Sequence, residues 1–498
     1  MRIVKTTSVA VSTAASILVI LSAISPAKLT AQVQGNNTVW SSSTTIGSSA
    51  FIDASAFTGN GTDLCDTLNY IYTHTPAIIP TTGGVIDARG LNGGNTSLTC
   101  AASPWNGVTS TPPTTVLLPA ATIVISAAWI LPNQTRIVGE GKVTTVIQPK
   151  STYSGDLIDM GSASCPSGVC SDVSIEHLDL GFPGNSYTGT NTNNGIVNAN
   201  SQNNSYVDDV TISNLGGIGL SVSAANSGPY TNIAYGTNQP NPGSTTPCGT
   251  SCPVAVRIQS PTRGLHGITC SGDTQTANQS SILGNGAANA AAIQVQANSN
   301  TIQDVHTEGF WDGIQIGATA NIGSIEVSNV TSGNSGSGGG PVTNTVHICG
   351  PFPNTSTLGA CASTLTGVVS DVTVRDVLNA NGVLTATIQD DITGTTISPT
   401  NNNLTGSPNA FSALYALGRA VSFSGVAAGT SLFTANPSLA GVDSATNVAT
   451  WGSENGIPTT TPCPTGTLFS NTAGAPMMGE HSLYICIGGN TWTPVTTN

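Results

Sequence analysis

The chain has 498 residues, only 7% of them charged, and its 24 acidic side chains outnumber 11 basic ones to give a formal charge of −13. Such an acidic chain would repel phosphate backbones, so nucleic acid is not an expected partner. The wealth of Gly, Ser, Thr and Asn does not indicate disorder, because Val, Ile and Leu recur throughout and provide apolar surface to bury.

Residues 1–31 have the features of a secretory signal peptide. Arg2 and Lys5 precede an apolar, small-residue stretch, and Ala31 stands at a suitable cleavage point. A transmembrane anchor is the alternative, but the apolar run is shorter than the roughly 20 residues of a spanning helix and is interrupted by Ser and Thr. We therefore predict a protein without a stable membrane anchor that is secreted or extracellular, at the cell surface or in the periplasm. Removal of this segment leaves a formal charge of −16.

The first expected elements lie between residues 62 and 149. The segment "TDLCDTLNYIY" (62–72) predicts a short helix, which Thr62 or Asp63 can cap and which places Leu64 and Leu68 on one face with Ile71. "GGVIDARGL" (83–91) predicts the first strand, and residues 129–149 predict further coils that turn at "GEG". A solenoid has an exposed first coil, which this helix would cover.

A short pattern then returns between residues 170 and 380. Its copies are "SDVSIEHL", "DDVTISNL", "GSIEVSNV" and "SDVTVRDV", with a partial copy "NTIQDV" that ends at Val305. Each copy has apolar residues two apart and then three apart, which predicts a half-buried strand followed by a corner. Ile302 and Val327 are 25 positions apart, and the 47 positions from Val327 to Val374 are close to two such coils. The period predicts a solenoid of parallel strands; leucine-rich repeats and a β-sandwich lack their own signals here.

The chain changes character after the repeats. We predict a signal peptide at 1–31, a parallel β-helix domain with its cap at 32–395, an irregular or linker region at 396–460 and a small β-module at 461–498. A module this small needs a disulfide or a neighbouring surface for stability.

All eleven cysteines follow residue 31, and in an exported protein their close spacing predicts disulfides that staple loops. A metal site is the competing interpretation, but "CPSGVC" and "CGTSC" lack nearby histidines. Cys270 is left over and is expected to be a buried small hydrophobe. The predicted pairs are Cys65–Cys100, Cys165–Cys170, Cys248–Cys252, Cys349–Cys361 and Cys463–Cys486.

Residues 50–150 resemble the N-terminal part of pectate-lyase-like, or polygalacturonase-like, right-handed β-helix proteins, and the repeats do so more loosely up to about 395. The motifs that carry the resemblance are "GNGTDLCDT", "GGVIDARGL", "TRIVGEG" and "TTVIQP", in that order. The resemblance implies an all-β fold, a right-handed single-stranded parallel β-helix with a short N-terminal capping helix and a small C-terminal β-module. It is weak for activity, because these motifs belong to the cap and first coils and the family includes lyases, hydrolases and non-enzymatic members.

The repeat alignment sorts the acidic residues. Asp172, Asp209 and Asp371 precede the first strand residue of their copies, so we interpret them as turn formers. Asp304 and Asp376 align with three further polar residues in a column that is similar to the stacked polar ladder of parallel β-helices; these are Asn214, Asn329 and His177.

Four places remain as candidate sites. In "VHTEGFWDGIQIG" (305–317), Glu308, Asp312 and His306 are candidate catalytic groups, and Trp311 can stack on a sugar ring. The alternative is a turn whose Trp covers the core edge. The other candidates are Glu176 and Asp179 as catalytic groups, and Asp208, Arg257 and His266 as substrate-binding groups.

The catalytic motifs of the named families are not matched. "RIQ", "LHG" and "QDD" are imperfect fragments of the polygalacturonase set in the wrong order, and "RIQSPTR" lacks the spacing of the pectate-lyase arginine segment. No metal ligands are assigned; a calcium site stays open, although no loop signature such as an EF-hand indicates one.

The sequence thus leads to two hypotheses. The first is a secreted protein that engages polysaccharide and cleaves it by lyase or hydrolase chemistry. The second is a non-catalytic extracellular adhesion or structural protein that binds glycan or protein. The hypotheses differ in geometry, because a hydrolase needs two carboxyl groups roughly 5 to 9.5 Å apart. The sugar, its linkage and the oligomeric state stay open.

Overall fold

The structure is a computed structural model. It describes residues 50–61, 63–108, 111–165, 168–182, 192–237, 254–272, 291–308, 310, 312–333, 344–349, 365–380, 386–390, 411–413, 451–454, 468–471, 483–488 and 491–494. The predicted signal peptide at 1–31 lies outside these residues.

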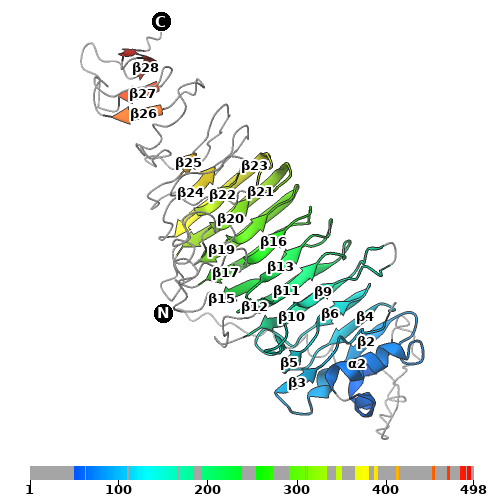
Figure 1. The fold of residues 1–498 in the computed structure, drawn as a ribbon. Coiled ribbons are helices and arrows are strands. Elements are labelled where there is room, and N and C mark those ends of the chain that lie inside the picture. The colour runs from blue at the N-terminus through cyan, green and yellow to red at the C-terminus, as the bar shows by residue number, and fades with distance from the viewer. Residues whose placement is uncertain are drawn as a thin grey trace, which may run out of the picture. The chain divides into compact units, whose positions relative to one another are not determined.

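The described residues form a parallel β-helix, as predicted from the repeats (Figure 1). Each coil runs along a fifteen-stranded sheet and then along a ten-stranded sheet, and the described strands of these two sheets pair in parallel. The fifteen-stranded sheet contains β1 (Ala50–Asp53), β2 (Gly84–Asp87), β3 (Ser97–Cys100), β4 (Thr114–Leu117), β5 (Thr122–Ile125), β7 (Thr135–Val138), β8 (Val146–Pro149), β10 (Ser174–Gly181), β12 (Tyr206–Ser213), β14 (Tyr230–Thr231), β15 (Ala234–Thr237), β17 (Leu265–Gly272), β19 (Asn300–Glu308), β21 (Ile322–Gly333) and β23 (Val369–Ala380). The ten-stranded sheet contains β6 (Trp129–Leu131), β9 (Asp156–Met160), β11 (Asn194–Asn198), β13 (Ile218–Val222), β16 (Val254–Ile258), β18 (Ala291–Val295), β20 (Asp312–Ile316), β22 (Asn344–Ile348), β24 (Ala386–Asp390) and β25 (Phe411–Ala413).

The N-terminal end of the stack carries the predicted capping helix. Helix α2 (Leu64–Thr73) begins after Asp63, whose side chain accepts a hydrogen bond from the Asp66 backbone N–H at 2.9 Å. Its Leu64, Leu68 and Ile71 are at most 5% exposed, so the predicted apolar face is confirmed. Two short 3-10 helices, η1 (Ala54–Asn60) and η2 (Arg89–Asn92), flank it. The first strand is β1, however, and not the predicted strand at 83–91, which is the second.

The long strands of the fifteen-stranded sheet bend at one residue each. The first half of β10 pairs with β7 and its second half with β8, and His177 stands between the halves with φ +55°. The same register position holds a left-handed residue in seven successive coils, with φ from +51° to +69°. These corner residues are His177, Asp209, Asn232, Gly267, Asp304, Asn329 and Asp376. Asn, Asp and Gly tolerate this conformation best, which explains the polar column.

The corner corrects one expectation from the sequence. Asp209 lies in the ladder with His177 and was wrongly grouped with Asp172 and Asp371. Asn214 also has a left-handed backbone, but it follows the end of β12 and donates to the Phe182 carbonyl, so it belongs to a different turn. Both residues suit a corner, and the apolar spacing of that copy alone did not decide between them.

The spacing of the coils is also partly corrected. Ile302 pairs with Val327, as the 25-residue spacing predicted. Val327 pairs directly with Val374, so the 47 residues between them form one coil and not two. That coil crosses the ten-stranded sheet once, at β22, and the remaining length is inserted sequence.

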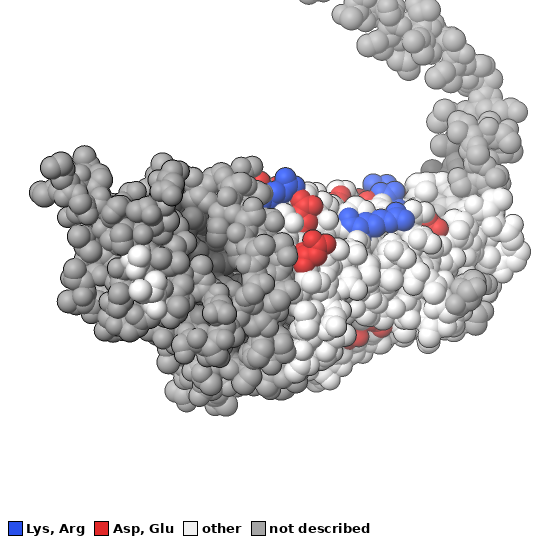
Figure 2. Space-filling model, turned by 90° about the horizontal axis from the view of Figure 1, so that it is seen from above, with Lys and Arg blue, Asp and Glu red and all other residues white. Residues whose placement is uncertain are grey.

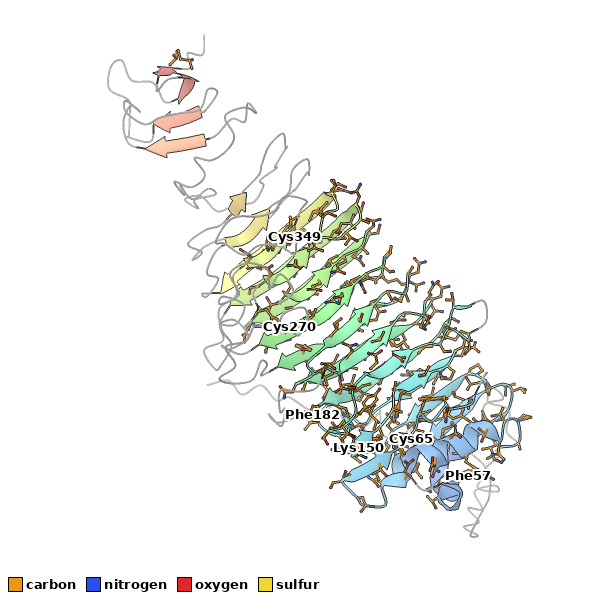
Figure 3. All side chains as sticks on the ribbon, in the orientation of Figure 1. Phe57, Cys65, Lys150, Phe182, Cys270 and Cys349 are labelled. Carbon is orange, nitrogen blue, oxygen red and sulfur yellow. A yellow bond between two sulfur atoms is a disulfide. The ribbon has the colours of Figure 1, made fainter. Side chains whose placement is uncertain are left out.

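The core is a column of stacked aliphatic side chains inside the coils (Figure 3). In β12, Val207, Val210 and Ile212 are 0% exposed. The three-position spacing between the buried residues Val207 and Val210 spans Asp209, where the strand bends. Cys270 lies in this core as a buried free thiol, as predicted. Burial raises the pKa of this thiol.

Two of the predicted disulfides are present, Cys65–Cys100 and Cys165–Cys170. The pairs Cys248–Cys252, Cys349–Cys361 and Cys463–Cys486 each have at least one cysteine outside the described residues. None of the helices in the described part of the chain has the length and hydropathy needed to span a bilayer.

A four-stranded sheet near the C-terminus matches the predicted β-module. It contains β26 (Trp451–Glu454), β27 (Leu468–Asn471), β28 (Leu483–Gly488) and β29 (Thr491–Pro494). β26 precedes the predicted start of this module at 461, and β25 extends the ten-stranded sheet past the predicted end of the β-helix at 395. The predicted linker at 396–460 therefore contains strands at both ends.

Candidate functional site: a groove on the ten-stranded sheet

A groove of about 210 Å³ lies on the outer face of the ten-stranded sheet. β6, β9 and β11 supply its floor through neighbouring residues of one outward column, Ile130, Asp159 and Val197. Ile130 is 43% exposed, which is unusual for a large aliphatic side chain in this chain's strands. The volume is below the roughly 300–1,000 Å³ of pockets that enclose whole small molecules, so it suits part of a longer ligand. The full lining is Ile130, Asp159, Gly161, Ser162, Ala163, Val197, Ala199 and Asn200.

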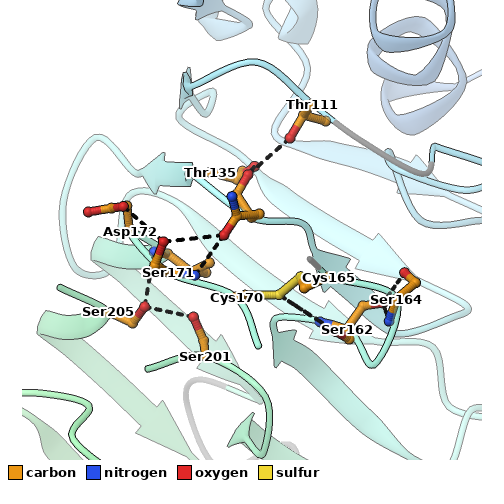
Figure 4. The surroundings of a disulfide bond; sticks show 12 residues. Thr111, Thr135, Ser162, Ser164, Cys165, Cys170, Ser171, Asp172, Ser201 and Ser205 are labelled. Carbon is orange, nitrogen blue, oxygen red and sulfur yellow. Dashed lines mark hydrogen bonds between the residues drawn. A yellow bond between two sulfur atoms is a disulfide. The ribbon is translucent and has the colours of Figure 1, made fainter. Parts of the chain in front are cut away.

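One wall of the groove is a loop that the Cys165–Cys170 disulfide closes (Figure 4). The Ser162 backbone N–H lies 3.2 Å from Cys170 Sγ, and the Cys170 backbone N–H donates to the Asn200 carbonyl at 2.8 Å. Gly161 has φ +83°, and a Cβ there would lie 2.8 Å from Cys170 Sγ, so the turn requires glycine. The disulfide and the neighbouring coil therefore fix this wall.

A pair of carboxyl groups stands in the groove floor. Asp159 is half-buried and hydrogen-bonds Asp156, three residues earlier on β9. Burial, and then the charge of Asp156, raise the pKa of Asp159 to about 7. Asp156 in turn accepts from Asn194 Nδ2 at 2.7 Å, and Tyr153 Oη donates to the Asp156 carbonyl at 2.6 Å. Because this pKa is raised, Asp159 keeps its proton at pH values where an ordinary aspartate has lost it, and in that form its carboxyl group can both donate and accept.

The sequence marks these two acids but does not predict that they meet. "DLIDM" places two acids three positions apart in an otherwise apolar strand, within a chain that is only 7% charged. A strand faces alternate residues outward, so acids three apart are not expected to meet. The link between them is a result of the structure.

The outward column continues along the sheet beyond the groove. Val197 is followed by Ser221 and Arg257, which are partly exposed, and Arg257 Nε donates to Gln294 Oε1 at 2.7 Å. The next three residues of the column are covered: Gln294, Gln315 and His347 are 1%, 3% and 0% exposed. The outer face of the ten-stranded sheet is therefore open at β6–β16 and closed at β18–β22.

The predicted site residues do not converge on this groove. Glu176 and Asp208 are direct neighbours in one outward column of the fifteen-stranded sheet, and His266 follows two rungs after Asp208 in that column. Arg136 binds Glu176 through two bonds of 2.6 Å, and Tyr206 Oη donates to it at 2.7 Å. Burial opposes the charged form, but these hydrogen bonds outweigh it and lower the pKa of Glu176.

Asp179 lies past the corner from Glu176 and is 3% exposed. Its Oδ2 accepts from the Val143 backbone N–H at 2.9 Å, whereas its Oδ1 is buried without a hydrogen-bond partner. Burial raises the pKa of this carboxyl.

His306 and Glu308 form a pair on β19, with 2.6 Å between Nε2 and Oε1. His306 occupies the same outward column as Asp179, but it is four rungs away, through Thr211, Ala234 and Thr269. At about 4.8 Å per rung, Asp179 and His306 are roughly 19 Å apart along this column. Glu308 and Asp179 therefore cannot act on one bond.

Asp312 lies on β20 of the other sheet and is 1% exposed. It accepts from His347 Nδ1 at 2.8 Å, from Asn344 Nδ2 at 2.9 Å and from Gln315 Nε2 at 3.3 Å. Its carboxylate is enclosed by its own sheet, so the predicted Glu308–Asp312 pair is not formed at the surface. Trp311 lies outside the described residues.

The positive charges near these acids are paired on the fifteen-stranded sheet. On the face drawn in Figure 2, most of the visible charged side chains gather in one band, with largely uncharged surface around it. The pairs are Arg89 with Asp87 and Glu140, Arg136 with Glu176, Lys142 with Asp209, and Arg375 with Glu326. Among the described residues, no group of three or more His, Cys, Asp or Glu could hold a metal ion.

The sequence matches no protein-family model and no curated protein. Among solved structures, the chain is similar to an endo-xylogalacturonan hydrolase from Aspergillus tubingensis, with 12% identity, a TM-score of 0.39, and coverage of 68% of this chain and 97% of that one. A mutant tailspike protein of E. coli bacteriophage HK620 in complex with a hexasaccharide gives 10% identity, a TM-score of 0.44, and coverage of 74% and 64%. The HK620 tailspike in complex with a pentasaccharide gives 13% identity, a TM-score of 0.42, and coverage of 70% of this chain and 65% of that one. The fold is established by this chain's own strand topology, which is that of a parallel β-helix.

Proposed function

We propose that this chain is a secreted β-helix protein that binds a polysaccharide in the groove of the ten-stranded sheet and does not cleave it there. One observation carries the proposal: the groove sets two apolar side chains, the exposed Ile130 and the partly exposed Val197, beside the hydrogen-bonded Asp156–Asp159 pair. A sugar ring can place its C–H groups against the apolar side chains and its hydroxyl groups against the two carboxyl groups. Ligand sites commonly combine an apolar lining with a few polar groups that fix orientation.

The carboxyl geometry argues for binding over hydrolysis. Two carboxyl groups that share a hydrogen bond have oxygens about 3 Å apart. Hydrolysis of a glycosidic bond needs roughly 5 to 9.5 Å between the two groups, which leaves room for the sugar or a water. Asp156 and Asp159 are too close for that role, and the acids predicted from the sequence are divided among separate surfaces.

A specific observation favours a second candidate, cleavage at β19. His306 is 38% exposed and hydrogen-bonds the buried Glu308, an arrangement in which a carboxylate orients a histidine that acts as a base. Among the described residues no second carboxyl accompanies this pair, so binding at the groove remains the function that the structure supports best.

Secretion is part of the same proposal. Disulfides persist in oxidising compartments, and the two disulfides that lie in the described residues fit a protein that is exported. The partner would then be an extracellular glycan.

The test is binding of the mature protein to a panel of insoluble and soluble polysaccharides, measured by pull-down and affinity electrophoresis. We expect Ile130→Ala to weaken binding about tenfold, because it removes the exposed aliphatic contact, while Val368→Ala leaves binding unchanged. Val368 is a matched control, since it is 42% exposed and lies outside the groove. Equal effects of the two variants, or no binding to any polysaccharide, would contradict the proposal.

Cleavage is tested in the same panel by release of reducing ends and of ultraviolet-absorbing product. Turnover that is lost in Glu308→Gln would establish the second candidate instead.

A further inference from the structure

We infer that the groove selects neutral glycans and rejects polymers that contain uronic acids. This inference rests on the proposed function and narrows its ligand class. It differs from what the family resemblance implies, because the substrates of pectate lyases and polygalacturonases are acidic.

The charge lining the groove is of one sign. Asp159 is the one ionisable residue among those that line it, and Asp156 stands behind it on the same strand. The neighbouring strands contribute Ile130 and Val197, and the loop wall contributes Gly161, Ser162 and Ala163, none of which can carry charge. A carboxylate on a sugar would therefore meet carboxyl groups and no counter-charge.

The positive charge on the same outward column does not compensate for these acids. Arg257 is the cation of the same outward column, but it lies three rungs from Asp159, or about 14 Å. Its Nε donates to Gln294 on the following strand, away from the groove. At about 14 Å and in salt, its attraction for a uronate in the groove is largely screened.

The hydrogen-bonding capacity of the pair fits an uncharged hydroxyl. When Asp159 holds its proton, its carboxyl group can donate to one sugar oxygen and accept from another. Tyr153 is the other titratable group that senses the pair; burial and then the charges of Asp156 and Asp159 raise its pKa to about 12, so it stays neutral. Binding of a neutral glycan thus requires no change of charge in the site, whereas binding of a uronate brings two like charges together.

The experiment compares neutral polymers (xylan, mannan and β-glucan) with acidic polymers (polygalacturonate and alginate) by affinity electrophoresis at pH 8 and about 0.15 M salt, where charges about 14 Å apart are largely screened. The wild-type mature protein should bind at least one neutral polymer and neither acidic one. Asp159→Asn removes the charge and should raise affinity for the acidic polymers by about tenfold. Asp371→Asn is the matched control: it makes the same charge change at an exposed corner outside the groove and suits the same left-handed backbone, and it should change nothing.

A second variant, Ala163→Lys, covers the case in which Asp159→Asn unfolds. It places a cation on the exposed loop wall and should also admit the acidic polymers. Preferential binding of the acidic polymers by the wild-type protein would overturn this inference and leave the proposed function intact. Binding to no polymer of either class would overturn both.

Discussion

His177 and Asp209 occupy the same corner of successive coils, both with a left-handed backbone, and their side chains meet with 2.7 Å between His177 Nδ1 and Asp209 Oδ2. Lys142 reaches the other oxygen of Asp209 at 2.7 Å. One carboxylate therefore ties together two coils and the loop after β7. The hydrogen bonds from Lys142 and His177 lower the pKa of Asp209.

This corner predicts a difference between two substitutions of Asp209. Asp209→Gly should lose the side-chain contacts but keep the backbone unstrained. Asp209→Ala should lower the free energy of unfolding by about 1 kcal/mol more, because a positive φ is unfavourable for Ala. The measurement is the free energy of unfolding from denaturant titration of each variant. Equal stability of the Gly and Ala variants would show that the backbone conformation of the corner contributes nothing.

The Glu176–Arg136 pair gives a second prediction. Glu176→Gln should lower the free energy of unfolding by about 1.5–3 kcal/mol, because it removes the charge from a buried group that accepts three kinds of hydrogen bond. Since the pKa of Glu176 is lowered in the folded state, the wild-type advantage should be present at neutral pH and disappear as pH falls below about 4. Glu326→Gln, at the more exposed pair with Arg375, should cost less than about 1 kcal/mol.

For Asp159 we expect the free energy of unfolding to depend on pH with the opposite sign to that for Glu176. Its pKa is about 7 in the folded chain against 3.8 for the ordinary group. Between these values the folded state holds a proton that the unfolded state has released, so the free energy of unfolding should fall as pH rises from about 4 to about 7. The difference between wild type and Asp159→Asn isolates this contribution from that of Asp179, whose pKa is raised in the same direction. A difference that is constant over this pH range would mean that Asp159 is ionised throughout.

The two disulfides should separate stability from binding. Cys65–Cys100 joins residues that are 35 positions apart, and Cys165–Cys170 joins residues that are 5 positions apart. Chain entropy assigns about 4 kcal/mol to the longer loop and about 2 kcal/mol to the shorter one. Replacement of Cys65 and Cys100 by Ala should therefore cost more stability but leave glycan binding intact, while replacement of Cys165 and Cys170 should cost less stability and weaken binding. Thermal unfolding and affinity electrophoresis of the two double variants check this, and the reverse order of binding would show that the loop is not a wall of the site.

The fold was predictable from the sequence because the spacing of apolar residues in each repeat indicates where the strand bends. An apolar residue three positions after the last, as from Val327 to Val330, leaves one extra polar residue, Asn329, which the structure places at the left-handed bend. The position of the bend was harder to predict where two residues that tolerate a left-handed backbone lie close together in one copy of the repeat, as with Asp209 and Asn214. Coil length failed where an insertion doubled the spacing, between Val327 and Val374.

The candidate site was not predictable in the same way. Residues such as Glu308 and Asp312 are four apart in the sequence, but they belong to different sheets, and Asp312 is enclosed by His347 and Asn344 from a later coil. The groove depends on three strands whose floor residues, Ile130, Asp159 and Val197, are 29 and 38 positions apart in the chain, and on a loop held by a disulfide. Proximity of acids along the chain does not report which surface each one reaches, because a corner turns the strand between them.

The covered stretch of the ten-stranded sheet sets a limit on what the open stretch can hold. The stretch that a glycan in the groove can follow extends from Ile130 to Ser221, three rungs or about 14 Å, and beyond it Arg257 is hydrogen-bonded to Gln294, which is buried. An oligosaccharide laid along the column gains contacts with each added unit until it reaches the closed part of the sheet, where it must leave the surface. Affinity should thus rise with oligomer length and then become constant, so that this face distinguishes short from long chains only below that length.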